Sequence, residues 1–142
     1  GGMSMAQISQ CLGKDVFYAY DRSVISAQVA KFRQFMPKRI HLHYAVKANP
    51  YWPVVNHLRA LVDGFDVASQ KEMLLAMQSG MPVHDISFAG PGKTDTELAA
   101  AITAGVTLNV ESVNELKRIC QLGQQLQSLC SCPTVTCLKN GS

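Results

Sequence analysis

The residue with the clearest chemical potential in this sequence is Lys47, within Tyr44–Pro50 (YAVKANP). Because strand side chains alternate, Lys47 is expected to share one strand face with Ala45, His43 and His41. The proline that closes the segment cannot continue a central strand, so Lys47 is predicted at a strand's C-terminal end. A lysine that is partly desolvated there can become a neutral amine and form a Schiff base with a carbonyl compound. The competing interpretation is a lysine that marks the strand end and points into water.

The two histidines of this segment offer a different chemistry. A His-x-His pair on the first strand of a barrel also resembles the metal site of amidohydrolases. However, His41 and His43 precede Lys47 by six and four residues. At a strand rise of ~3.3 Å per residue, they lie ~13–20 Å from Lys47, toward the other end of the strand. The cysteines add no metal site, because Cys130 and Cys132 lack the two spacer residues of a zinc motif. We therefore predict histidines of the core or of the N-terminal face, and no metal.

Three helices are predicted from a repeated pair of signals. Capping boxes, in which a hydroxyl residue is followed three positions later by glutamate, begin at Ser69, Thr94 and Ser112. A glycine that can end each helix follows eleven positions later, at Gly80, Gly105 and Gly123. The three helices are therefore expected to have similar lengths.

Short strand candidates precede these helices. They are Gly64–Ala68, Ile86–Ala89 and Val106–Val110. Upstream, Arg39–Lys47 is a further strand candidate, followed by a helix that Pro53 can open at its first position. Downstream, Thr134–Leu138 is a candidate fifth strand. Near the start, we expect a strand at Phe17–Tyr20 and a helix at Ser23–Phe35 with Asp21 as its cap.

Strands that alternate with helices of this length indicate an α/β protein with a parallel sheet. A doubly wound sheet and a (β/α)8 barrel both fit this pattern. No Gly-x-Gly-x-x-Gly motif is present, and Gly90–Thr94 (GPGKT) resembles only the end of a phosphate-binding loop. Ser87 stands where that loop needs a glycine, and Pro91 lacks a donor N–H. We therefore expect no nucleotide-binding loop.

Composition excludes several other classes. The chain has 142 residues, of which 47% are apolar and 16% charged, so a mostly disordered state is excluded. The net charge is +3 and the basic residues are scattered, which argues against a nucleic-acid partner or a membrane surface. No apolar stretch approaches the ~18 residues of a membrane span. Without a leader-like N-terminus, a cytoplasmic protein with reduced thiols is expected.

Four motifs occur in order along the chain: Tyr44–Pro50 (YAVKANP), Gly64–Ser69 (GFDVAS), Phe88–Thr94 (FAGPGKT) and Leu108–Ser112 (LNVES). Together they resemble the fold-type III pyridoxal-phosphate-dependent decarboxylases, the diaminopimelate/ornithine decarboxylase family. The likeness covers roughly residues 1–125. The His-Leu-His-Tyr-Ala run and the early Gly-Gly-Met are most similar to the exosortase A-associated subgroup.

The resemblance implies a partial (β/α)8 TIM-type barrel with about the first five strands. This barrel part would span 39–142 with an atypical tail from about 126, and an N-terminal strand and helix in 1–38 would lead into it. The full-length enzyme is implied to be a homodimer that acts on a small amino-acid substrate, with pyridoxal 5'-phosphate as cofactor.

The resemblance also implies roles for individual residues. The lysine of the YAVKAN-type motif forms the internal aldimine in this family, and it matches Lys47. Asp66 and Glu72 match family acids that bind beside the cofactor lysine. Asp66 equally fits a polar strand residue, and Glu72 completes a capping box. Lys93 and Glu111 close loops at the same edge, where we expect them to be solvated.

A complete barrel takes ~250 residues, so we expect an incomplete decarboxylase that is inactive alone. Lys139 stands where the family has an arginine that contacts the cofactor, so the tail departs from the pattern. One alternative is an alanine-racemase-like or cofactor-carrier barrel of the same fold. A second is a non-catalytic remnant that pairs with another chain through its open sheet edge.

Overall fold

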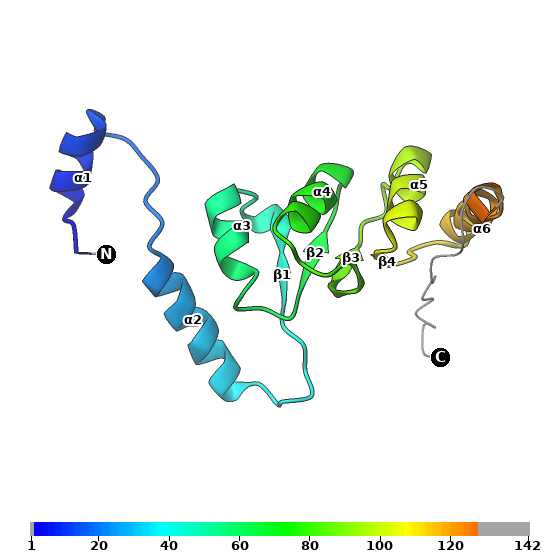
Figure 1. The fold of residues 1–142 in the computed structure, drawn as a ribbon, viewed down its shortest axis with the longest axis horizontal. Helices are drawn as coiled ribbons and strands as arrows, with labels where there is room; N and C mark the ends of the chain where they lie inside the picture. Colours follow the sequence, from blue (N-terminus) through cyan, green and yellow to red (C-terminus); the bar gives the residue numbers. More distant parts are fainter. Residues whose placement is uncertain (1, 128–142) are drawn as a thin grey trace. The chain divides into compact units, whose positions relative to one another are not determined.

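The computed structural model of this chain describes residues 2–127 (Figure 1). The chain divides into two compact units, one up to Ile40 and one from His41 onward. The division predicted at residue 38 lies close to this boundary. That the two units are separate domains stays a prediction. None of the helices in the described range has the length and apolar composition needed to cross a bilayer.

The N-terminal unit contains two helices, α1 (Met5–Leu12) and α2 (Arg22–Phe35). Helix α1 was not predicted, although Ser4 and Gln7 form a reciprocal capping box at its start. Helix α2 begins as predicted, because the Asp21 carboxylate accepts the N–H of Ser23 at 2.8 Å.

The strand predicted at Phe17–Tyr20 is wrong, since these residues form no regular element. A strand needs a neighbour for its backbone N–H and C=O groups, and no described strand pairs with this segment. The apolar residues there predicted an extended chain but could not supply the partner.

The second unit contains a parallel sheet with strand order β1-β2-β3-β4. The strands are β1 (His43–Ala45), β2 (Gly64–Val67), β3 (Ile86–Phe88) and β4 (Thr107–Leu108). These four predicted strands are confirmed, each shorter than expected. The candidate fifth strand, Thr134–Leu138, and the atypical tail beyond Gln127 lie outside the described residues.

Helices follow each strand. They are α3 (Trp52–Leu58), α4 (Gln70–Gln78), α5 (Asp95–Ala104) and α6 (Val113–Gln127), with short 3-10 turns η1 (Val46–Ala48) and η2 (Val83–Asp85). Pro53 occupies the second position of α3 rather than the first, because Trp52 already begins the helix.

The predicted helix ends are correct for α4 and α5 and wrong for α6. Gly80 follows the end of α4, and Gly105 caps α5 with a left-handed φ of 74°. Gly123 instead lies inside α6. An interior glycine costs a helix only about 1 kcal/mol, and α6 packs along α5, which offsets that cost.

The topology distinguishes between the two α/β architectures that the sequence left open. Parallel strands joined in sequential order by right-handed crossovers place all their helices on one face of the sheet. Figure 1 shows α3, α4, α5 and α6 succeeding one another along the sheet in strand order. A doubly wound sheet reverses direction and has helices on both faces. The unit is therefore part of a barrel-type α/β fold, as predicted.

The core lies between the strands and these helices. Strand residues that point to the helices are almost fully buried: Phe65, Val67, Ile86, Phe88 and Leu108. They meet helix residues that are equally buried: Val55, Met73, Leu98 and Ile119. The ring of Tyr44 packs edge-on against that of Phe65, with centroids 6.1 Å apart. Burial of this face fixes the strand register, because a one-residue slip would expose every one of these side chains.

Candidate active site at the carboxyl edge of the sheet

Lys47 lies in the turn η1, which follows β1 directly. The turn is anchored by Val46, which is completely buried, and by Asn49, whose N–H donates to the carbonyl of Val46 at 3.1 Å. The hydroxyl of Tyr44 also donates to the carbonyl of Asn49 at 3.1 Å. The Asn49 side chain then accepts the N–H of Tyr51, which leads into α3. These contacts hold the segment that carries Lys47 at the C-terminal end of the strand.

Two details of the Lys47 prediction are corrected. The strand alternation stops at Ala45, so Lys47 does not share a strand face with His43. The Lys47 side chain is exposed in this chain rather than partly desolvated. The position of Lys47 just beyond the carboxyl end of a parallel strand is as predicted, and η1 packs beside β2 and α4.

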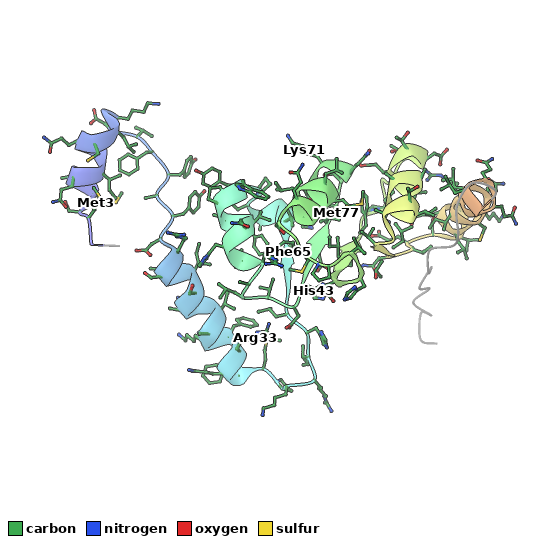
Figure 2. The ribbon with its side chains drawn as sticks, viewed as in Figure 1. Met3, Arg33, His43, Phe65, Lys71 and Met77 are labelled. Atoms are coloured by element: carbon green, nitrogen blue, oxygen red, sulfur yellow. The ribbon has the colours of Figure 1, made fainter. Side chains whose placement is uncertain are left out.

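Asp66 is the centre of a polar row on the sheet face opposite the helices. It is paired in register with Ala45 on one side and Ser87 on the other. Its Oδ1 lies 3.2 Å from Nδ1 of His43 and accepts a hydrogen bond from the Ser87 hydroxyl. The Asp66 side chain is 47% exposed, so this face is open to solvent in the described chain. Figure 2 labels His43 on β1 and Phe65 on β2, the two strands that meet at this row.

Sequence reasoning identified Asp66 but missed its partners His43 and Ser87. A signal was present in Gly64, which pairs with His43. A Cβ on Gly64 would lie 2.5 Å from Cε1 of His43 and would also clash with the carbonyl of Asp85. Glycine at this position therefore leaves space for the imidazole to lie across β2 and reach Asp66.

Glu72 caps the start of α4. Its Oε2 accepts the N–H of Ala68 at 2.8 Å, and its own N–H donates to the Ser69 hydroxyl at 3.3 Å. The hydroxyl half of the predicted box is confirmed, whereas the carboxylate reaches one residue further back than predicted. Glu72 also lines a cavity of about 390 Å³, whose other lining residues are Pro50, Ser69, Lys71, Leu75 and Gln78.

The loops that follow β3 and β4 differ from prediction in one respect. Lys93 was expected to be solvated, but its side chain is 1% exposed and its Nζ lies 2.7 Å from Oε1 of Glu115. Glu111 is exposed as expected, and its carboxylate accepts the N–H of Gly90 at 2.5 Å. A buried ammonium needs a partner for each N–H, which removes Lys93 from the set of freely reactive amines.

This edge therefore combines an accessible primary amine with carboxylates on neighbouring strand ends. Lys47 follows β1, while Asp66 and Glu72 lie on β2 and on the helix after it. An exposed lysine amine fits a cofactor that carries an aldehyde, because such a group must reach the amine from solvent. Within residues 2–127, no three His, Cys, Asp or Glu side chains come together as a metal site requires.

Comparison with known proteins agrees with this arrangement. Residues 22–131 match the family described as pyridoxal-dependent decarboxylase, pyridoxal binding domain. The chain is 36% identical over 103 residues to 2-[(L-alanin-3-ylcarbamoyl)methyl]-2-hydroxybutanedioate decarboxylase of Staphylococcus aureus, covering 72% of this chain and 26% of that protein. It is 33% identical over 126 residues to diaminopimelate decarboxylase of Aquifex aeolicus, covering 88% of this chain and 30% of that protein.

Solved structures share the fold. A protein of Aquifex aeolicus superposes with a TM-score of 0.83 at 31% identity over 96% of this chain and 33% of its own. Helicobacter pylori diaminopimelate decarboxylase complexed with L-lysine gives 0.75 at 31% identity, over 84% of this chain and 32% of its own. This chain thus spans about a third or less of the length of the relatives described here.

The family model covers most of the chain, and the observed parallel strand-and-helix unit is the one that the solved relatives contain. The cofactor of this family's domain is pyridoxal phosphate. The chain belongs to the pyridoxal-dependent decarboxylases, as part of their pyridoxal binding domain.

Proposed function

We propose that this chain is the N-terminal part of a pyridoxal-phosphate-dependent amino-acid decarboxylase in which the amine of Lys47 holds the cofactor. The observation that carries the proposal is the position of Lys47. It is an exposed amine just beyond the carboxyl end of β1, the edge at which barrel enzymes of this class bind their ligands. The family match includes this position.

The neighbouring carboxylates support distinct roles. The hydrogen bond from Ser87 and the contact with His43 hold Asp66 in one orientation on the sheet face opposite the helices. From there we propose that Asp66 interacts with the positive charge of the lysine and its bound group. Glu72 keeps the start of α4 in place through Ala68 and Ser69, and we propose that it borders the cofactor from that side.

Bound pyridoxal phosphate supplies an electron sink for bond cleavage at the α-carbon of an amino acid. The protein then has to hold the cofactor, orient the bond that breaks and exclude water. In our proposal, Lys47 and the row centred on Asp66 hold the cofactor. The Staphylococcus aureus and Aquifex aeolicus relatives that match in sequence are named decarboxylases, which favours decarboxylation over the racemase-like and carrier alternatives.

For the whole enzyme, we propose a homodimer acting on a small amino acid. The complex of the Helicobacter pylori relative with L-lysine supports this substrate class. Assignment to the exosortase A-associated subgroup, a cytoplasmic location and inactivity of this chain alone stay predictions.

A titration of the purified chain with pyridoxal phosphate tests the proposal. We expect a saturable absorbance band of lysine-bound cofactor in the parent chain and its loss in Lys47→Ala. Lys117→Ala is the matched control, because Lys117 is also an exposed lysine but lies on α6. The proposal is contradicted if Lys47→Ala retains the band at the strength of the control.

A further inference from the structure

A buried ammonium group connects the loops that follow β3 and β4. Nζ of Lys93 donates to the carbonyl of Gly90 at 2.7 Å and to the carbonyl of Asn109 at 2.8 Å. Its third partner is Oε1 of Glu115, also at 2.7 Å. All three N–H donors of the ammonium are therefore used, one within its own loop and two across to the next strand and helix.

The acceptor side of the pair completes a closed network. Oε2 of Glu115 accepts the N–H of Glu111 at 2.8 Å, and the carboxylate of Glu111 accepts the N–H of Gly90. Gly90 is thus bound at both its N–H and its carbonyl. Its φ of 117° is a conformation that residues with a side chain rarely adopt. Because glycine can adopt many other backbone conformations, these two bonds select one of them.

Thermodynamic stability is a weak explanation for this network. The side chains of Lys93 and Glu115 are 1% and 5% exposed, so both charges have lost their hydration. The cost of that desolvation offsets most of the attraction between them. Apolar side chains of similar size at such positions commonly give the protein equal or greater stability. What apolar side chains cannot supply is the set of directed bonds that fixes the two loops against each other.

We propose that Lys93 and Glu115 form a positioning pair. The pair holds the Gly90 loop (residues 89–94) and the Glu111 loop (residues 109–112) in one arrangement at the rim of the cofactor site. The inference rests on the proposed function, because the two loops leave the carboxyl ends of β3 and β4, the edge at which Lys47 lies. Neither residue of the pair touches the cofactor in this account. They act through Gly90 and Glu111.

The test uses the whole chain with the pair replaced by Lys93→Met together with Glu115→Met. The double substitution leaves no unpaired charge buried, and Gly90, Asn109 and Glu111 are open enough for water to replace the lost bonds. Glu111→Ala is a second variant that cannot disturb the core, since Glu111 is exposed. Asp95→Asn is the matched control, because it removes the exposed ion pair between Asp95 and Arg118 and leaves the bond from Arg118 to the carbonyl of Lys93 in place.

Two measurements are made on each variant: hydrogen exchange of individual amides by NMR, and the dissociation constant for pyridoxal phosphate. We expect faster exchange at the amides of Gly90 and Glu111 in the double variant, and at Gly90 in Glu111→Ala. Amides of β2 and α5 should keep their protection, and so should every amide in the control. Cofactor binding should weaken by about tenfold in the double variant.

Unchanged exchange at both Gly90 and Glu111 overturns the inference, and so does unchanged cofactor affinity with faster loop exchange. If the double variant unfolds, the same two criteria are applied to Glu111→Ala, and unchanged exchange at Gly90 overturns the inference. Failure of the proposed function alone has another signature, namely no absorbance band of lysine-bound cofactor in the parent, or a band that Lys47→Ala retains. The exchange data then still decide whether the pair positions the loops.

Discussion

Nδ1 of His43 lies 3.2 Å from Oδ1 of Asp66, across the boundary between the first two strands. The contact is possible because Gly64, the register partner of His43, has no side chain. Ser87 reaches the same carboxylate oxygen from the third strand. Three neighbouring strands therefore orient one carboxylate on the face opposite the helices, close to the edge where Lys47 lies in the turn after β1.

Replacing Gly64 with alanine should destabilise the fold. The added methyl group would meet the carbonyl of Asp85 and the ring of His43, and the backbone carbonyl cannot rotate away. We expect a loss of about 1–3 kcal/mol in the free energy of unfolding, as for other overpacked sites, measured by urea denaturation. Gly92→Ala is the control and should cost little, because nothing lies within 4 Å of a Cβ there. Equal stability of the two variants would contradict the close approach at Gly64.

The contact between His43 and Asp66 predicts coupled energetics. In a double-mutant cycle with His43→Ala and Asp66→Ala, we expect a coupling of about 0.5–1 kcal/mol in the free energy of unfolding, as for partly exposed pairs. Urea denaturation of the four proteins measures it. Strictly additive effects would show that the two side chains do not interact in solution.

Glu97 predicts a pH dependence of stability. Its carboxylate accepts the N–H of Thr94 at 3.0 Å and the N–H of Gln70 at 3.1 Å, and these bonds lower the pKa of Glu97 below its usual value. A group whose pKa is lowered by folding adds stability above its unfolded pKa and loses it as the pH falls through the folded pKa. The stability difference between the parent and Glu97→Gln should therefore be greatest near neutral pH and disappear in acid. Thermal unfolding across that range would refute the account if the difference grew on acidification.

Gly123 distinguishes the observed helix from the one that the sequence predicted. Inside α6, with nothing within 4 Å of a Cβ, Gly123→Ala should stabilise the chain by about 0.5–1 kcal/mol. A glycine that ended the helix in a left-handed conformation would give the opposite sign. Gly105→Ala, where φ is 74°, is the comparison and should destabilise.

The features predicted correctly from sequence were those with local causes. Asn49-Pro50 predicted the end of β1 to within two residues, and hydroxyl caps at Ser69 and Thr94 located two helix starts. What the sequence could not reveal depends on distant partners. The segment Phe17–Tyr20 has strand-like residues and no described strand to pair with.

The same reason explains the errors at the site. Lys93 can be buried because Glu115, 22 positions later, accepts a hydrogen bond from its ammonium group, and no local sequence pattern predicts such a partner. The role of His43 depends on the register between β1 and β2, which places its ring over Gly64. Alternation and caps predicted the parallel strand-and-helix order, and the family resemblance implied the barrel. The side-chain contacts could be seen only in the packed strands.

Reductive trapping shows directly whether Lys47 holds the cofactor. The chain is incubated with pyridoxal phosphate, reduced with borohydride, digested and examined by mass spectrometry, which identifies each lysine that carries the cofactor. We expect the phosphopyridoxyl group to be concentrated on the peptide containing Lys47 at low cofactor concentration, with Lys93 unlabelled because it is buried. Labelling spread evenly over the exposed lysines, or absent from Lys47, would contradict this expectation.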